Sequence, residues 1–400
     1  MSEFDMDARR VIEALRSGIP SRAVGQYFSE ARPQIMKKVS DTLESICEGD
    51  ASAGMVISGK YGEGKTHLLN TVFHMAHMNR MVVSYLTISK ESPFDKLYLV
   101  YQKLIANTYL PGREQPGFTY VLDQITPNSP VASDLLLYSA KELETDKLYY
   151  VLGAYLNTED QEEKFRLLSD LEGDFIPNPV LKKTYKRIFN RPVKFNTNFA
   201  KTKHSRDYLL FMSHLFKKLG YNGWVILIDE AELTGRLGKK ARLNSYRNLS
   251  EFLMPAKELE SVYTLVALSA SYSEDVIEAK HEYQNLEETF PDSPEPYRSV
   301  LKMLENAEQL APLTKAEVAD VISRIIAFHE KAYGWTANVS SAHVIAETGS
   351  SGYLLRTKLR SAIEYLDQLY QYGEAGDTQV GELESELYGE IPSLEVMSED

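Results

Sequence analysis

Short apolar runs alternate with amphipathic segments along most of the chain. Four runs predict buried strands, at residues 54–58, 81–88, 224–228 and 264–269. Apolar residues recur at helical spacing over residues 6–18, 32–48 and 206–219. The first strand is followed by a glycine-rich loop, a helix that opens at Lys65 and the second strand. This order is typical of a parallel α/β sheet.

Two regions depart from this alternation. Residues 111–205 contain seven prolines with helical pieces between them, which predicts a helical insertion. Further on, Thr314-Lys315-Ala316-Glu317 matches a capping box, so a helix should begin there and run to Tyr333 before Gly334. Another helix is expected over about 352–370. These two helices predict a helical lid after the sheet.

We therefore predict an α/β P-loop fold, a three-layer sandwich with a parallel sheet, a helical insertion and a C-terminal helical lid. The predicted segments are an N-terminal helical segment (1–50), the first part of the core (51–110), the basic insertion (111–205), the second part of the core (206–312), the lid (313–370) and an acidic tail (371–400).

Composition narrows the class of protein. Hydrophobic residues make up 43% of the chain, enough for a sizeable core, but no run approaches the length that crosses a membrane. The acidic start Met1–Asp5 does not resemble a signal peptide. Cys47 is the only cysteine, which excludes an internal disulfide and fits a reducing compartment. We expect a cytoplasmic protein without membrane contact.

The net charge of −13 is unevenly distributed. Residues 371–400 carry nine acids and no Lys or Arg, which leaves 48 acids and 44 bases, a net charge of −4, in residues 1–370. The sign of the charge must therefore be judged patch by patch. We expect the tail to be mobile or docked on a partner.

Residues 59–66 match the pattern G-x-x-x-x-G-K-[ST] at every fixed position. Glycines let backbone N–H groups turn toward phosphates, the lysine reaches the β- and γ-phosphates, and the hydroxyl binds Mg²⁺. The pattern predicts an ATP site with Mg²⁺. The predicted nucleotide-binding residues are Gly59, Lys60, Tyr61, Gly62, Glu63, Gly64, Lys65, Thr66 and His67, with Lys65 also catalytic and Thr66 also a metal ligand.

Asp229 and Glu230 follow the apolar strand 224–228. A carboxylate at this place holds Mg²⁺, and an adjacent glutamate can orient and deprotonate the attacking water. We predict Asp229 as a metal ligand and Glu230 as the catalytic base. A strand that ends in Asp-Glu is common by itself, so this prediction depends on the glycine loop.

Two further positions are candidates for contact with the γ-phosphate. Ser269 and Ser271 end the strand after Asp229-Glu230, and nothing local distinguishes them; we take Ser269 as the candidate. Arg356 opens the last predicted helix and could reach a nucleotide held between core and lid, with Arg360 one turn later as a rival.

From Lys182 to Arg206 the chain has nine bases and no acid, interleaved with four aromatic residues. Bases attract phosphates and aromatic faces can stack on nucleobases, which makes DNA a candidate partner. An acidic protein surface, the chain's own tail, or no partner at all remain alternatives.

Together these residues resemble AAA+ ATPases of the origin-recognition-like group. More closely, Ile12–Pro20, Gly59–Leu68, Gly220–Glu232 and Ala241–Leu249 are similar to the ATP-binding proteins of BREX-type phage-defence operons. The resemblance covers roughly residues 8–370 and is looser across 111–205.

The resemblance implies antiviral defence against foreign DNA together with other subunits, a helicase or a methyltransferase among them. It assigns phosphate and metal contacts to Lys65 and Thr66, hydrolysis to Asp229 and Glu230, and the lid arginine to Arg356. Self-association in the presence of ATP is implied too. The origin-recognition relatives carry a winged helix after the lid, which we do not expect here, and the long separation of Lys65 from Asp229 implies the insertion.

Three functions compete. The first is an ATP-hydrolysing module that assembles or regulates a DNA-targeting complex. The second is a slow-hydrolysing nucleotide switch that acts as a scaffold, and the third is a stand-alone DNA loader. Glu230 favours hydrolysis, since a pure switch does not need it. No helicase motifs beyond the nucleotide-binding residues support the loader.

Overall fold

A computed structural model describes residues 3–18, 22–28, 32–49, 51–348 and 354–376. These residues divide into two compact units. The first unit holds residues up to 36, 58–72 and those from 309 onward, and the second holds 37–57 and 73–308. Most of the expected acidic tail lies outside the described residues. Each unit is described by itself.

A six-stranded sheet, in the order β3-β2-β4-β5-β1-β6, organises the second unit. Its strands are β1 (Ala53–Gly59), β2 (Val82–Thr87), β3 (Thr108–Tyr109), β4 (Trp224–Asp229), β5 (Val262–Ser269) and β6 (Glu308–Gln309). Strand β4 runs parallel to both β2 and β5, while β3 is antiparallel to β2. Four of these strands confirm the predicted ones. The two-residue strands β3 and β6 are too short to leave a periodic pattern.

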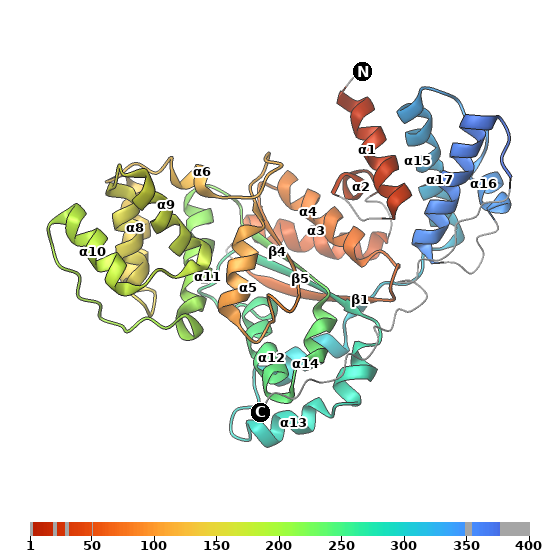
Figure 1. The fold of residues 1–400 in the computed structure, drawn as a ribbon. Coiled ribbons are helices and arrows are strands. Elements are labelled where there is room, and N and C mark those ends of the chain that lie inside the picture. The colour runs from red at the N-terminus through yellow and green to blue at the C-terminus, as the bar shows by residue number, and fades with distance from the viewer. Residues whose placement is uncertain (1–2, 19–21, 29–31, 50, 349–353, 377–400) are drawn as a thin grey trace. The chain divides into compact units, whose positions relative to one another are not determined.

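Helices pack on this sheet and form one apolar core with it. They include α5 (Leu97–Ala106), α11 (Lys201–Lys218), α12 (Lys239–Leu253), α13 (Glu282–Thr289) and α14 (Tyr297–Glu305), with the short turns η2 (Ala231–Arg236) and η3 (Ser273–Glu278). Helix α3 (Pro33–Glu48) precedes β1 and is not part of this core. Helix α5 packs on β2 with α11 behind it, and α12 packs on β5 with α14 behind it (Figure 1). Trp224 is buried in this core, where its indole N–H donates to Ser84 Oγ at 2.8 Å.

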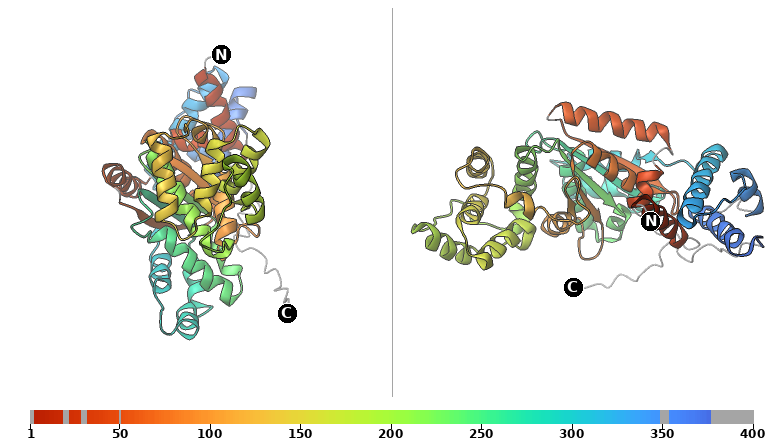
Figure 2. Two further views of the ribbon diagram at one scale, coloured as in Figure 1. Left: turned by 90° about the vertical axis from the view of Figure 1, so that its left-hand side faces the viewer. Right: turned by 90° about the horizontal axis from the view of Figure 1, so that it is seen from above.

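The predicted insertion is a group of short helices between β3 and α11. They are α6 (Thr119–Leu122), α7 (Pro130–Lys141), α8 (Lys147–Asn157), α9 (Gln161–Ser169), η1 (Asp170–Asp174) and α10 (Asn178–Phe189). Both α9 and α10 pack on α8, and α7 packs on α11 (Figure 2). A fully buried ion pair joins Lys147 to Asp170 at 2.6 Å, and Tyr208 of α11 donates to the same carboxylate at 2.6 Å. Burial raises the pKa of Asp170, so its charge depends on these partners.

The first unit contains the glycine loop and a separate helical core. Its helices are α1 (Glu3–Ser17), α2 (Arg22–Tyr27), the first part of α4 (Lys65–Met78), α15 (Lys315–Tyr333), α16 (Ser341–Glu347) and α17 (Leu355–Tyr372). Helix α1 packs on α15 and α17 through Val11 and Ile12. Thr314 and Glu317 form the predicted capping box, and Gly334 ends α15 with a φ of 69°. Helix α16 was not predicted.

These features confirm the predicted fold class, an α/β fold with a mostly parallel sheet and C-terminal helices, as in a P-loop AAA+ sandwich. Within the described ranges, no helix combines the length and the hydropathy needed to cross a membrane.

Candidate functional site

The glycine loop has the backbone that phosphate binding requires. Strand β1 ends at Gly59 and α4 begins at Lys65, so the loop leads directly into a helix N-terminus. Gly62 and Gly64 have φ values of 76° and 91°, which side chains with a Cβ rarely adopt. The first turn of α4 presents N–H groups that lack carbonyl partners within the helix, together with the positive end of the helix dipole. The loop is therefore a ready anion site.

Lys65 lies folded over this loop. Its ammonium donates to the carbonyl oxygens of Gly59 at 2.8 Å and Lys60 at 3.2 Å. Carbonyl acceptors hold the cation close to the loop, where phosphate oxygens could replace them. Thr66, the predicted metal ligand, is the next residue of α4 and is half-buried.

Arg32 is a second cation at the loop, and the sequence did not predict it. Its guanidinium is buried and donates to the carbonyl oxygen of Glu63, and to that of Ala311 at 3.4 Å. Burial lowers the pKa of this guanidinium, although nearby carboxylates oppose the shift. A Cβ on Gly64 would lie 3.5 Å from its Nη1. Arg32 thus stabilises the loop through hydrogen bonds to residues that are far away in the sequence.

The predicted lid arginine does meet the glycine loop. Arg356 lies in the first turn of α17, where its Nη1 donates to the hydroxyl of Tyr61 at 3.2 Å and its guanidinium lies 5.1 Å from the ring centroid. Leu354 lies beside the loop as well, since a Cβ on Gly62 would come within 3.2 Å of its side chain. Gly352 and Tyr353, which were expected to lead into this helix, lie outside the described residues.

The rival arginine, Arg360, lies one turn further along α17. Its Nε and Nη1 are buried and find no hydrogen-bond partner among the described residues. A Cβ on Gly18 would lie 3.2 Å from the Cδ atoms of both Arg356 and Arg360, so both arginines also lie against the end of α1. The contact with Tyr61 distinguishes Arg356.

His67 has a role that the pattern did not suggest. Its Nε2 lies 2.9 Å from the carbonyl oxygen of Phe28, so the side chain is directed at the N-terminal segment. Desolvation lowers the pKa of this imidazole, which favours the neutral ring with a proton on Nε2. Any contact of His67 with a phosphate would therefore come from its backbone N–H.

In the second unit, the end of β4 presents two carboxylates with different surroundings. Asp229 is buried; it accepts a hydrogen bond from the hydroxyl of Tyr85 at 2.8 Å and one from the N–H of Glu230 at 3.0 Å. Burial, followed by the charge of Asp229, raises the pKa of Tyr85, so this hydroxyl stays a donor. Tyr85 lies on β2, and no motif in the sequence singles it out.

Glu230 is exposed and has a φ of 56°. A positive φ is uncommon for a residue other than glycine, and such conformations gather at functional sites. The sharp turn directs the glutamate away from the apolar strand that precedes it. Asp229 is therefore fixed in place, whereas Glu230 is accessible to water.

Ser269 lies at the end of β5, half-buried. Its Oγ lies 3.2 Å from Oγ of Ser271, so the two serines that the sequence left undistinguished form one polar pair. Their shared hydrogen bond allows either to present a hydroxyl at this strand end.

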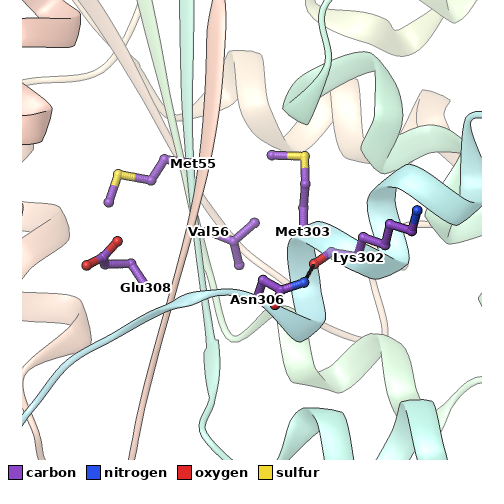
Figure 3. A pocket seen from close by; sticks show the side chains of 6 residues that line it. All are labelled: Met55, Val56, Lys302, Met303, Asn306 and Glu308. Atoms are coloured by element: carbon purple, nitrogen blue, oxygen red, sulfur yellow. Dashed lines mark hydrogen bonds between the residues drawn. The ribbon is translucent and has the colours of Figure 1, made fainter.

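An open pocket lies elsewhere in the second unit, between β1 and the end of α14 (Figure 3). Its lining residues are Met55, Val56, Lys302, Met303, Asn306 and Glu308. Two of its polar side chains already have partners: the Asn306 amide donates to the Lys302 carbonyl at 2.8 Å, and Glu308 accepts from Lys38 at 2.6 Å. None of the predicted site residues lines it. The glycine loop does not need a deep cavity to bind phosphates, because backbone N–H groups at a helix N-terminus make the contacts.

Comparison with known proteins identifies the family of the chain. The chain matches the family described as "BREX system ATP-binding protein BrxC/D" over residues 5–128 and 151–383, which include the glycine loop, Asp229-Glu230, Ser269 and Arg356. No curated protein matches the chain. Because the family match covers most of the sequence, this chain belongs to the BREX system ATP-binding protein BrxC/D family.

Proposed function

We propose that this BREX ATP-binding protein hydrolyses ATP, with the phosphates on residues 59–66 and the hydrolytic carboxylates at the end of β4. The observation that carries the proposal is the glycine loop, where two glycines with positive φ lead into a helix whose first residue is Lys65. A helix N-terminus with an adjacent ammonium matches the charge of a triphosphate. The family match supports the choice of ATP.

Each residue of the proposed site has a distinct task. Lys65 exchanges its carbonyl acceptors for β- and γ-phosphate oxygens. Glu230 accepts the proton of the attacking water, and Ser269 donates a hydrogen bond toward the γ-phosphate. Arg356 brings positive charge from the lid to the phosphate chain.

Magnesium fits the donor set. The hydroxyl of Thr66 and the carboxylate of Asp229 are hard oxygen ligands of the kind that Mg²⁺ prefers. Tyr85 and the backbone N–H of Glu230 hold the Asp229 carboxylate in one orientation, as metal ligands require. When bound, Mg²⁺ neutralises phosphate charge.

We further propose that the nucleotide cycle assembles or regulates a DNA-targeting complex of the BREX system. The partners would be other BREX subunits, with a helicase or a methyltransferase as candidates. The helical lid supports this role, because Arg356 links it to Tyr61 of the glycine loop. Exchange of that contact for a phosphate contact would couple the bound nucleotide to the position of the lid.

Steady-state hydrolysis tests the proposal. ATPase rates should be measured with Mg²⁺ for the protein alone, with DNA and with its operon partners, using Glu230→Gln as the background. We expect a rate above that background that DNA or a partner changes. Tight ATP binding with turnover no faster than Glu230→Gln under all conditions would instead identify a nucleotide switch.

Self-association is the second part of the proposal, because AAA+ relatives share the ATP site between subunits. The arginine that would act on a neighbour's nucleotide must be accessible. The candidates are Arg236, Arg242, Arg247 and Arg298. Arg242 is buried and bonded to Glu282 at 2.6 Å, and Arg298 is half-buried and paired with Glu287 at 2.7 Å. Arg236 and Arg247 are exposed. Sedimentation velocity of Glu230→Gln at micromolar concentration should show a larger species with Mg-ATP. An unchanged monomer would contradict a homo-oligomer.

A further inference from the structure

Helix α10 of the insertion has two faces of opposite character. Leu181 and Thr184 are buried, while Lys182, Lys183 and Lys186 are exposed at the three- and four-residue spacing of a single helix face. The chain that follows the helix adds Arg191 and Lys194, which are exposed too. We call Lys182, Lys183, Lys186, Arg191 and Lys194 the α10 face.

Side-chain contacts hold the two parts of this face together. The ammonium of Lys182 lies 5.3 Å from the ring of Phe195, which adjoins Lys194. Tyr150 donates to the carbonyl oxygen of Lys194 at 3.5 Å and packs against Tyr185 of α10 at 5.1 Å. The loop and the helix therefore present their cations from one packed element.

The cations of the α10 face have no carboxylate within ion-pair distance among the described residues. Three other bases of the same stretch do have such partners. Arg187 pairs with Glu163 and with Asp160, Lys203 pairs with Glu144 at 3.2 Å, and Arg206 pairs with Glu251 at 2.8 Å. Asp146, which lies beside this stretch, accepts the N–H of Asn196 at 2.8 Å. The positive charge of the α10 face is thus not neutralised by carboxylates of the described residues.

The aromatic residues of this stretch are half-buried and pack against neighbouring rings of the insertion. Tyr185 lies edge-on to Tyr150 and 4.4 Å from Phe189, and Phe195 also meets Tyr150 edge-on, at 5.3 Å. Phe199 lies 4.2 Å from the buried ammonium of Lys147. Proteins that bind single strands stack exposed rings on the bases. These rings are part of the packed insertion, so the α10 face offers charge alone.

We propose that the α10 face binds the sugar–phosphate backbone of double-stranded DNA without reading its sequence. A group of exposed cations on one packed element matches the high charge density of a duplex, which holds about one negative charge per 1.7 Å of axis. Contacts with phosphates position a protein on DNA and carry no sequence information. The proposal deepens the function proposed above, on which it depends for its biological use, by placing a DNA contact on this chain.

Fluorescence anisotropy without nucleotide tests the proposal. The probes are two 30-base-pair duplexes of unrelated sequence and a single-stranded 30-mer, titrated between 50 and 200 mM KCl. Five phosphate contacts predict that duplex affinity falls about 500-fold over this range, since each contact adds about 0.9 to the log–log slope. Both duplexes should bind alike and more tightly than the single strand.

The decisive variant carries Lys182→Gln, Lys183→Gln, Lys186→Gln and Lys194→Gln. It should lose duplex affinity at 50 mM KCl, and its salt slope should fall by about 3.6. The matched control replaces four exposed lysines elsewhere in the same unit, Lys37, Lys257, Lys280 and Lys302, with glutamine. It changes the net charge equally and should bind like the parent.

Three results would overturn the proposal: no duplex binding by the parent at 50 mM KCl, equal binding by the α10-face variant, or equal loss in the control. Tighter binding of the single strand would overturn the choice of duplex. The ATPase rate and the unfolding temperature of each variant should match the parent. If hydrolysis is absent in all of them while duplex binding follows the pattern above, the proposed ATPase is wrong and the α10 face stands.

Discussion

The cations around the glycine loop and the cations of the α10 face differ in where their donors are directed. Lys65, Arg32 and Arg356 bond to the carbonyl oxygens of the loop or to the hydroxyl of Tyr61. The α10 face bonds to no carboxylate among the described residues. Cations whose positions are fixed by hydrogen bonds suit a small anion, because the geometry of the site is set before the anion binds. Exposed cations without ion pairs suit a long polyanion, which can bind to them at many positions along its length.

From this difference we expect the two regions to bind their ligands independently. Loss of a loop cation should affect ATP and leave the affinity for duplex DNA unchanged, while loss of α10-face cations should do the reverse. Salt should weaken duplex binding by the α10 face more than ATP binding by the glycine loop, since released counterions dominate binding to a polyanion.

Glu230→Gln should slow ATP hydrolysis by about 10²–10⁴-fold, the range that a positioned general base contributes. A carboxamide cannot accept the proton of the attacking water, but it keeps the shape of the side chain. ATP affinity and duplex affinity should both persist. Single-turnover hydrolysis and nucleotide binding should be measured on the same protein. Glu232→Gln is the matched control, and near-normal turnover by Glu230→Gln would refute the assignment.

Lys65→Ala should weaken ATP binding by about 10–100-fold, because charge-assisted hydrogen bonds to phosphate contribute roughly 1.5–3 kcal/mol. Lys60→Ala is the control within the loop, since Lys60 is exposed and the pattern gives its side chain no phosphate role. Calorimetry with Mg-ATP measures the change. A loss of duplex affinity by Lys65→Ala would break the separation between the two regions.

Local patterns predicted the parts of the site that depend on neighbours in the sequence. The glycine loop, the apolar strand before Asp229 and the capping box at Thr314 each have a signature only a few residues long. Arg32 has none, because its acceptor on Glu63 is 31 residues away. Tyr85 likewise meets Asp229 only through the pairing of β2 with β4.

The basic stretch shows the same limit. Its charge was evident from the sequence, but the cancellation of Arg187 by Glu163 and Asp160 depends on the packing of α9 and α10 on α8. The packing of the aromatic residues could not be predicted either, because Tyr185 packs against Tyr150, which belongs to α8. Periodicity identifies which residues face outward, and tertiary packing decides which of those already have a partner.

Arg356→Ala should lower ATP affinity or turnover by about tenfold, because it removes one charge-assisted hydrogen bond. Tyr61→Phe separates this role from the contact seen here, because it removes the hydroxyl that accepts from Nη1 and keeps the ring under the guanidinium. We expect Tyr61→Phe to be close to the parent in both assays. Equal losses in the two variants would mean that Arg356 acts by bracing the loop and not through the phosphates.

A single change within α10 should have a smaller effect. Lys183→Gln removes an exposed cation without an ion pair, so duplex affinity at 100 mM KCl should fall severalfold and the salt slope by about 0.9. Arg187→Gln removes a cation that Glu163 and Asp160 already neutralise, and should change both much less. The two residues are neighbours on one helix, so equal effects would show that the internal ion pairs do not matter.

The smallest effect concerns an anion within the glycine-loop unit, Asp367 of α17. It accepts from Arg16 of α1 at 2.7 Å and lies 3.0 Å from Nε2 of His329 on α15. Trp335 donates to Nδ1 of that imidazole at 2.9 Å, so the neutral ring carries its proton on Nε2 and donates it to Asp367. The carboxylate, which belongs to α17, thus links α1, α15 and α17.

Asp367→Asn should therefore lower the free energy of unfolding at pH 7 by about 1–2 kcal/mol, as charge-assisted bonds in a partly exposed site do. Burial alone would raise the pKa of Asp367, but the hydrogen bonds from His329 and Arg16 outweigh it and lower the pKa below its ordinary value. A carboxyl with a lowered pKa stabilises the fold fully above about pH 4 and loses this contribution as the pH falls further, through its folded-state pKa. Thermal unfolding of parent and variant from pH 7 to pH 3 should show a constant difference down to about pH 4 and a shrinking one below it. Glu13→Gln, which removes the exposed partner of Arg16, should change little at any pH. A difference that persists undiminished to pH 3 would mean that the charge of Asp367 does not hold α1 to α15 and α17.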